Sequence, residues 1–173
     1  MIRIVRIAAT LATAAVLGAG LAAPAHAAPP EPYCYGGPGP SWETTFKGVR
    51  MTMSVMCQWL DVGRSWYFGR ARLTLQHDGN LVIYDQSNRP RWATGTNGSG
   101  ATQLVFQHDG NLVLYTAGYG RAVWASNTRH RCRNASPNVE TLGLQSDSNF
   151  VIYCRYDRHD PNMFAIWSTG TVF

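Results

Sequence analysis

The sequence predicts an all-β domain, and three observations support this prediction. Five residues in the pattern Gln-x-Asp-x-Asn-x-Val-x-Tyr occur complete three times, beginning at Gln76, Gln107 and Gln145. Short apolar stretches alternate with polar residues at a period of two, and turn residues interrupt them about every ten residues. After residue 27 no stretch of useful length has a helical period. Because the chain is repetitive from residue 70 onward, the repeats determine the fold.

Residues 1–27 have the features of a secretory signal peptide. Two arginines stand near its start, an apolar run extends to Ala23, and the segment Ala25 to Ala27 offers small residues where a signal peptidase cleaves. The alternative is a membrane anchor, but the run is rich in Ala and Gly and lacks a basic stop-transfer flank. We therefore expect the protein to be secreted and extracellular, with no membrane insertion.

The rest of the chain divides into a leader and one domain. Residues 28–41 are rich in Pro and Gly and read as an N-terminal linker, whereas residues 42–173 suit a single domain with one core. The net charge of +5 falls to +3 once the two signal-peptide arginines are removed. Arg129, Arg131 and Arg133 form the only basic cluster, which we interpret as a solvated loop. We expect no nucleic-acid partner because no basic stripe is present.

Four cysteines in an exported chain predict two disulfides, which sequence alone allows to connect in three ways. We favour Cys34–Cys57 and Cys132–Cys154, because both pairs close local loops of similar length. Zinc binding is the alternative, but no C-x-x-C or H-x-x-x-H spacing supports it. We therefore expect no metal site.

Strands are predicted both before the repeats and within them. Residues 48–68 contain an alternating stretch and several aromatic residues, and we expect strands there that complete the first repeat and help to close the domain. In the first two repeats, an Asp-Gly turn joins an alternating stretch to a β-branched one, which predicts a hairpin. Ser148 replaces the turn glycine in the third repeat, and residues 154–165 are an insertion there. A tryptophan block ends each repeat, at Trp92–Thr96, Trp124–Thr128 and Trp167–Thr171.

The period of two gathers the polar side chains of each motif on one face of a hairpin. Asn80, Val82 and Tyr84 point to one face of a strand, while Leu81 and Ile83 point to the core. A carboxylate, two amides, a phenol and one apolar patch suit the hydroxyls and the C–H face of a sugar. The candidate sugar-binding residues are Gln76, Asp78, Asn80, Val82, Tyr84, Gln107, Asp109, Asn111, Val113, Tyr115, Gln145, Asp147, Asn149, Val151 and Tyr153.

The three motifs and the tryptophan blocks resemble those of the bulb-type (monocot) mannose-binding lectin family, over about residues 42–173. The resemblance implies a β-prism II fold with three antiparallel four-stranded sheets around a pseudo-threefold axis. Trp92, Trp124 and Trp167 would then pack at the centre instead of stacking on sugars. Members of this family often exchange C-terminal strands to form dimers. The resemblance therefore implies a homodimer of this kind, formed through residues 169–173.

The resemblance implies a role for each motif residue as well. The Asp and Asn of a motif would bind the axial 2-hydroxyl of mannose, the Gln the 3-hydroxyl and the Tyr the 4-hydroxyl, while the Val packs on the apolar face. The third site departs from the pattern, because Cys154 follows Tyr153 directly and a bridge to Cys132 would reshape or cover the site. We rank the sites second, first, third.

The predicted function is that of a secreted bacterial lectin that binds mannose-containing glycans or mannan, without a cofactor. The alternatives are a bacteriocin-type antimicrobial protein and a β-prism scaffold without sugar binding, but all fifteen motif positions are intact. An enzyme is disfavoured because glycoside hydrolysis needs two nearby carboxylates and each motif has one Asp. We interpret His77 and His108 as exposed turn residues and residues 157–160 as a charged loop, not as metal ligands.

Overall fold

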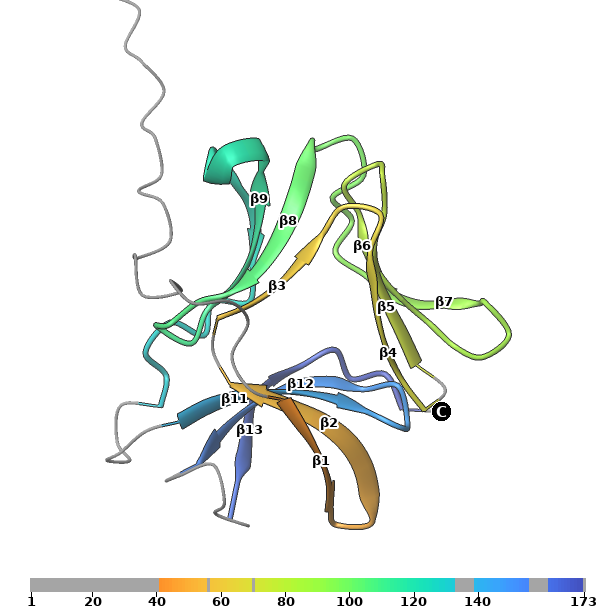
Figure 1. Cartoon of the computed structure of the whole chain (residues 1–173), viewed down its shortest axis with the longest axis vertical. Coiled ribbons are helices and arrows are strands. Elements are labelled where there is room, and N and C mark those ends of the chain that lie inside the picture. The colour runs from red at the N-terminus through yellow and green to blue at the C-terminus, as the bar shows by residue number, and fades with distance from the viewer. Residues whose placement is uncertain (1–40, 56, 70, 133–138, 156–161, 173) are drawn as a thin grey trace, which may run out of the picture.

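The computed structural model describes residues 41–55, 57–69, 71–132, 139–155 and 162–172. The predicted signal peptide, most of the N-terminal segment and residues 157–160 lie outside this described part. The described chain forms three antiparallel sheets arranged as the sides of a triangular prism (Figure 1). This arrangement confirms the predicted all-β, β-prism II fold.

Each sheet is built around the hairpin of one repeat. The first sheet has the order β4-β5-β6-β7 and the second has the order β10-β9-β8-β3, while the third sheet has the order β1-β2-β11-β12-β13. The strands of the first sheet are β4 (Ser65–Phe68), β5 (Ala71–Leu75), β6 (Leu81–Tyr84) and β7 (Pro90–Ala93). Those of the second are β3 (Gln58–Asp61), β8 (Ala101–Phe106), β9 (Leu112–Thr116) and β10 (Ala122–Ala125), with the short 3-10 helix η2 (Ala117–Tyr119) between the last two. Those of the third are β1 (Ser41–Phe46), β2 (Val49–Val55), β11 (Val139–Gln145), β12 (Phe150–Arg155) and β13 (Phe164–Ser168).

The segment before the repeats contributes one strand to every sheet. Its strands β2, β3 and β4 pair with β11, β8 and β5, so they join the third, second and first sheets in turn. The sequence-based expectation that these strands complete the first repeat is therefore wrong for β2 and β3. Each repeat supplies only three strands. A fourth strand from the segment before the repeats, residues 49–68, covers the edge that would otherwise remain unpaired. Strand β1 then adds a fifth strand to the third sheet, where four were expected.

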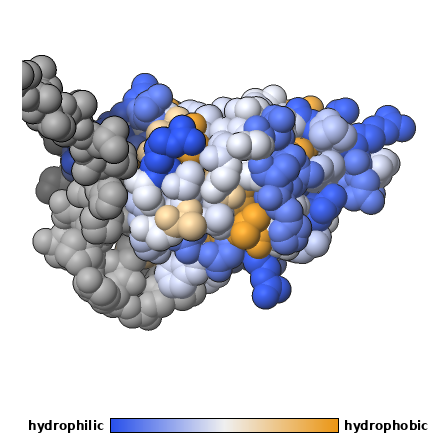
Figure 2. All heavy atoms as spheres, turned by 90° about the horizontal axis from the view of Figure 1, so that it is seen from above, coloured by the Kyte–Doolittle hydropathy of each residue, from blue (hydrophilic) through white to orange (hydrophobic). Residues whose placement is uncertain are grey.

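The inner faces of the sheets bury the apolar set that the period of two predicts. Leu73, Ile83, Leu104 and Leu114 are fully buried. On the face drawn in Figure 2, hydrophilic residues predominate and apolar residues show only as small, separate patches. No helix in the described part of the chain is long and apolar enough to cross a membrane.

The three block tryptophans meet at the centre of the prism. The ring centroids of Trp92 and Trp124 lie 6.0 Å apart, those of Trp92 and Trp167 lie 6.0 Å apart, and those of Trp124 and Trp167 lie 5.8 Å apart. All three pairs pack edge to face, which is a favourable geometry for aromatic rings. They pack against one another at the centre, as expected, and each is partly buried against the hydrophobic core.

The predicted bridge between Cys132 and Cys154 is present, with the two Cα atoms 5.6 Å apart. Cys154 is fully buried and follows Tyr153 on strand β12, so its side chain points to the opposite face from the motif. The bridge therefore lies behind the third site and does not cover it, contrary to the expectation. The other predicted bridge involves Cys34, which lies outside the described residues.

Candidate functional site

The motif has the same backbone conformation in all three repeats. The N–H of the motif Gln donates to the carbonyl of the motif Asn at 2.8–2.9 Å, and the residue after the Asp donates back to the Gln carbonyl. That residue has a positive φ in every repeat, namely 85° at Gly79, 79° at Gly110 and 72° at Ser148. Glycine adopts this conformation without strain, whereas Ser148 must be held in it. Thr171 helps to hold it by donating to the Ser148 carbonyl at 2.7 Å.

The motif Asp is fixed by its own turn. One oxygen of each carboxylate accepts the backbone N–H of the Asn two residues later, at distances of 2.9 Å, 3.0 Å and 3.1 Å in the three repeats. This is the Asx turn that short acidic and amide side chains favour. The second carboxylate oxygen is left to accept a hydrogen bond from outside the turn.

The motif Asn is fixed by the hydroxyl residues of the tryptophan block. In the first site, the Asn80 side-chain carbonyl accepts from the Thr94 hydroxyl and the Thr96 N–H, both at 3.2 Å. In the second site, Asn111 accepts from Ser126 and Thr128 at the same distances. The third site repeats this with Thr169 and Gly170 around Asn149. Because the carbonyl oxygen is occupied, the amide NH2 is the group that each Asn offers to a ligand.

These hydroxyl residues are positioning residues that the sequence analysis did not recognise. The blocks were interpreted only as carriers of core tryptophans. The sequence does contain a pattern that indicates this role, because a hydroxyl residue stands two and four positions after each block Trp. These pairs are Thr94 and Thr96, Ser126 and Thr128, and Thr169 and Thr171. The second member of each pair also donates to the turn carbonyl at 2.6–2.7 Å, which ties the block to the motif turn.

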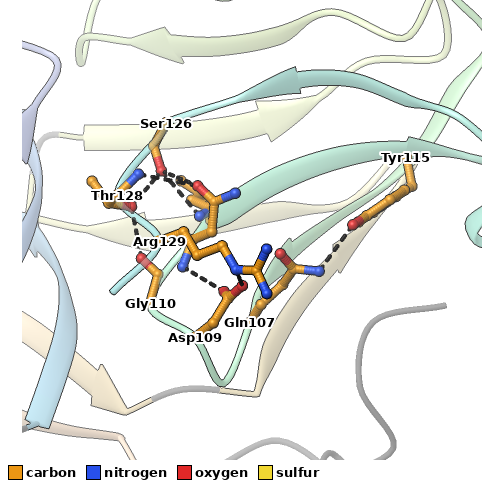
Figure 3. A network of polar contacts seen from close by, with 9 residues as sticks. Gln107, Asp109, Gly110, Tyr115, Ser126, Thr128 and Arg129 are labelled. Carbon is orange, nitrogen blue, oxygen red and sulfur yellow. Dashed lines mark hydrogen bonds and ion pairs between the residues drawn. The ribbon is translucent and has the colours of Figure 1, made fainter. Parts of the chain in front are cut away.

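The motif Gln and Tyr form a pair across the hairpin. The Gln side-chain NH2 donates to the Tyr hydroxyl oxygen at 2.6 Å in the first site, 2.9 Å in the second and 2.6 Å in the third. The Gln carbonyl oxygen is left as an acceptor and the Tyr hydroxyl as a donor. Figure 3 shows this pair in the second site, on the same side of the hairpin as Asp109. Each motif thus presents two acceptors and two donors around a buried Val.

The first site is the most open of the three. Asp78 is exposed, and Gln76, Asn80 and Tyr84 are half-buried. The guanidinium of Arg72 lies over the Tyr84 ring, 4.3 Å from its centroid, and makes a cation–π contact with it. All polar groups of the motif therefore reach the surface here.

The second site is partly covered by Tyr119 of the 3-10 helix η2 and by Arg129, which follows strand β10. Tyr115 is only 6% exposed because the Tyr119 ring packs against it, with centroids 5.9 Å apart. This burial raises the pKa of the Tyr115 hydroxyl. The Nε atom of Arg129 lies 3.0 Å from the second carboxylate oxygen of Asp109. The sequence analysis assigned Arg129 to a solvated loop and did not connect it with the motif.

The third site is closed by the N-terminal hairpin, which is formed by strands β1 and β2. Gln145 and Tyr153 are each 6% exposed, and Met51 and Met53 beside them are fully buried. A Cβ built on Gly143 would lie 3.0 Å from the sulfur of Met53, so the thioether fills the space on the motif face. The Phe46 ring packs edge to face against Tyr153, and burial raises the pKa of that tyrosine. The order of exposure is first, second, third, whereas the sequence ranked the second site ahead of the first.

The two histidines at matching positions in the turns, His77 and His108, are both exposed, as expected. Within the described ranges, no three His, Cys, Asp or Glu side chains come together in a way that would hold a metal ion.

A buried carboxyl group lies beneath the turn of the second site. A Cβ built on Gly110 would approach the Glu140 carboxyl to 2.8 Å, so glycine is required for this close packing. Burial raises the pKa of Glu140, and the nearby Asp109 adds to this effect, while His130 and His108 oppose it. The folded protein therefore favours the neutral form of this group more than the unfolded chain does.

This pKa predicts a pH-dependent loss of stability that Glu140→Gln removes. A raised folded-state pKa contributes stability below the unfolded-state pKa, and that contribution is lost as the pH rises through the folded-state value. The variant should therefore gain stability relative to the natural protein as the pH rises from about 4 to 7. Urea denaturation at several pH values measures this difference, and a constant difference between the two proteins would contradict it.

The fold is shared with solved lectin structures. A monocot mannose-binding lectin of Gastrodia elata, described as monomeric, is 42% identical with a TM-score of 0.54, and the match covers 69% of this chain and 96% of that one. The mannose-specific agglutinin of snowdrop (Galanthus nivalis) bulbs, solved with methyl α-D-mannoside, is 35% identical with a TM-score of 0.51, and the match covers 70% and 97%. A Marasmius oreades lectin is 25% identical with a TM-score of 0.56, and the match covers 69% and 90%.

Two other comparisons, with models of protein families and with curated proteins, gave no match. The identity to the Gastrodia lectin nonetheless extends over nearly the whole of that protein. The chain therefore belongs to the monocot mannose-binding lectin family.

Proposed function

We propose that the protein is a secreted, non-catalytic lectin that binds mannose-type glycans through its first and second sites. The observation that supports this most directly is which polar atoms of the motif are hydrogen-bonded within the protein and which are left for a ligand. In the first site, the hairpin and the tryptophan block fix each polar side chain by one atom and leave its other polar atom for a ligand. The second site repeats these contacts, with Arg129 added at the outer oxygen of Asp109. The predicted signal peptide would deliver the protein outside the cell.

The free groups match the hydroxyls of mannose. Each sugar hydroxyl has one donor and two acceptor lone pairs. The free oxygen of Asp78 and the NH2 of Asn80 would meet the axial 2-hydroxyl as acceptor and donor. The Gln76 carbonyl would accept from the 3-hydroxyl, and the Tyr84 hydroxyl would donate to the 4-hydroxyl. Val82 would contact the C–H face of the ring.

The size of the site sets a low affinity. A few hydrogen bonds of about 0.5–3 kcal/mol each leave little free energy after the costs of association. A shallow site for one mannose therefore binds at about the millimolar level, near −4 kcal/mol. Two such sites on one domain increase the apparent affinity for a multivalent glycan through effective concentration. We do not assign sugar binding to the third site, because its Gln and Tyr are covered.

A titration followed by nuclear magnetic resonance tests the proposal one site at a time. The side-chain NH2 signals of Asn80, Asn111 and Asn149 report on the three sites separately. Methyl α-D-mannoside should shift the first two signals and leave the third unchanged. Methyl α-D-galactoside should shift none of them, because its 2-hydroxyl is equatorial.

Two outcomes would contradict the proposal. If neither the mannoside nor a mannan polymer shifts the Asn80 or Asn111 signal, the motifs serve only as scaffold. If the galactoside shifts both signals as strongly as the mannoside, the axial 2-hydroxyl is not what the sites recognise.

A further inference from the structure

We propose that Arg129 sets the specificity of the second site, so that this site favours a mannose-type glycan bearing an acidic group over a neutral one. The proposal rests on sugar binding at the motif and adds a preference that the first site lacks. Three features support it: the ion pair of Arg129 with Asp109, the residues at the matching positions of the other repeats, and the remaining donors of the guanidinium.

The ion pair occupies the oxygen that the first site leaves open. In the second site, one oxygen of Asp109 accepts the Asn111 N–H at 3.0 Å and the other lies 3.0 Å from Arg129 Nε. In the first site, Asp78 makes the same turn contact at 2.9 Å, and no cation among the described residues pairs with it. A neutral sugar at the second site must therefore compete with Arg129 for the Asp109 carboxylate.

The repeats differ at the position that directly follows the tryptophan block. Arg129 directly follows the last Thr of its block, where the first repeat has Asn97 and the third has Val172. The backbone around this position is otherwise alike, since Gly98 and His130 donate to the carbonyls of Asp78 and Asp109 at 2.7 Å and 2.8 Å. The first site therefore shows the motif without an arginine at this position, and an Arg129→Asn variant separates the effect of Arg129 from that of Tyr119.

The guanidinium has donors left for an anion. Its side chain is 67% exposed and uses Nε for the contact with Asp109. In the view of Figure 3, the guanidinium appears between the side chains of Asp109 and Gln107. Arginine has five N–H donors in a planar fork that matches carboxylate and phosphate oxygens in pairs. An acidic group on the glycan would take the two terminal nitrogens while Arg129 neutralises Asp109.

The expected effect is moderate, because the ion pair is exposed. Such pairs contribute little free energy, so displacing Arg129 should weaken a neutral mannoside by about two- to fivefold relative to a site without it. An acidic mannoside meets the same competition at Asp109 but gains the attraction of its own charge to the guanidinium, so its advantage over the neutral sugar should decrease as salt is added.

The test uses three probes and one variant of the full mature protein. The probes are methyl α-D-mannoside, its 6-phosphate and the corresponding 6-carboxylate, which separate phosphate from carboxylate recognition. In the natural protein, the Asn111 amide signal should titrate several-fold more tightly with at least one acidic probe than with the neutral one. The Asn80 signal should show no such preference. Arg129→Asn, which installs the residue of the first repeat, should remove the preference at Asn111 and tighten neutral binding by about two- to fivefold.

The results distinguish a failure of the proposal for Arg129 from a failure of the lectin function itself. Equal titration of Asn111 by all three probes would overturn the proposal, as would an Arg129→Asn variant that keeps the acidic preference. In both cases Asn80 still titrates with the neutral mannoside, so the lectin function stands. If no probe shifts either signal, the lectin function itself fails, and the role of Arg129 fails with it.

Discussion

Trp124→Ala is expected to lower the free energy of unfolding by about 3–5 kcal/mol, the usual cost of truncating a large aromatic residue in a core. Trp124 packs edge to face on both Trp92 and Trp167, so its removal takes away two of the three contacts at the centre of the prism. The three rings come from three different sheets, so the cluster joins all three sides of the prism. Because Trp124 is itself only partly buried, the effect should lie toward the lower part of that range.

Urea denaturation of the oxidised protein measures this change. Tyr67→Ala is the matched control, because Tyr67 is also a large aromatic residue of a sheet but is 71% exposed. Its replacement should change the free energy of unfolding by no more than about 0.5 kcal/mol. Similar effects of the two substitutions would mean that the tryptophan cluster does not hold the sheets together.

The repeat hairpins were predictable because their information is local. The period of two separated Leu81 and Ile83 from the outward-facing Val82 and Tyr84, and the structure buries the first two on the inner face as expected. The motif spacing likewise brought Gln76 and Tyr84 opposite each other, and a hydrogen bond of 2.6 Å joins them. Such features depend on strand geometry over fewer than ten residues, which sequence patterns report well.

Features that depend on pairing between distant segments were not predictable. Strand β2 pairs with β11 about ninety residues later, and nothing in its own alternation identifies this partner. The closure of the third site follows from that pairing, because it places Met51 and Met53 on the motif face. The motif of the third repeat is complete in sequence, so its burial is visible only once the neighbouring strands are known.

Asn80→Ala is expected to abolish detectable binding of a simple mannoside at the first site. The Asn80 carbonyl is already held by Thr94 and Thr96, and its NH2 is therefore the group left to donate to the 2-hydroxyl. Losing this donor removes one hydrogen bond and leaves the 2-hydroxyl oxygen without a donor, although the hydroxyl still donates to Asp78, and this costs about 1–3 kcal/mol. From a millimolar starting point, a loss of about tenfold or more places binding beyond ordinary titration.

The substitution also removes the acceptor that the block hydroxyls use, so a second variant separates binding from folding. Asn80→Asp keeps a side-chain oxygen for Thr94 and Thr96 and replaces only the NH2 donor. Both variants should lose the shift of the Gln76 side-chain amide signal on adding methyl α-D-mannoside. Asn111→Ala should leave that signal responsive and silence only the second site.

Asn149→Ala is the matched control for the closed site. Asn149 also accepts two hydrogen bonds from its block, from the Thr169 hydroxyl and the Gly170 N–H, but the Gln and Tyr of its motif are covered by the N-terminal hairpin. Its replacement should affect stability and leave mannoside binding at the other two sites unchanged. If Asn149→Ala instead reduces the total binding of mannoside while Asn80→Ala does not, the third motif is the active one, and the hairpin of β1 and β2 must move away from it in solution.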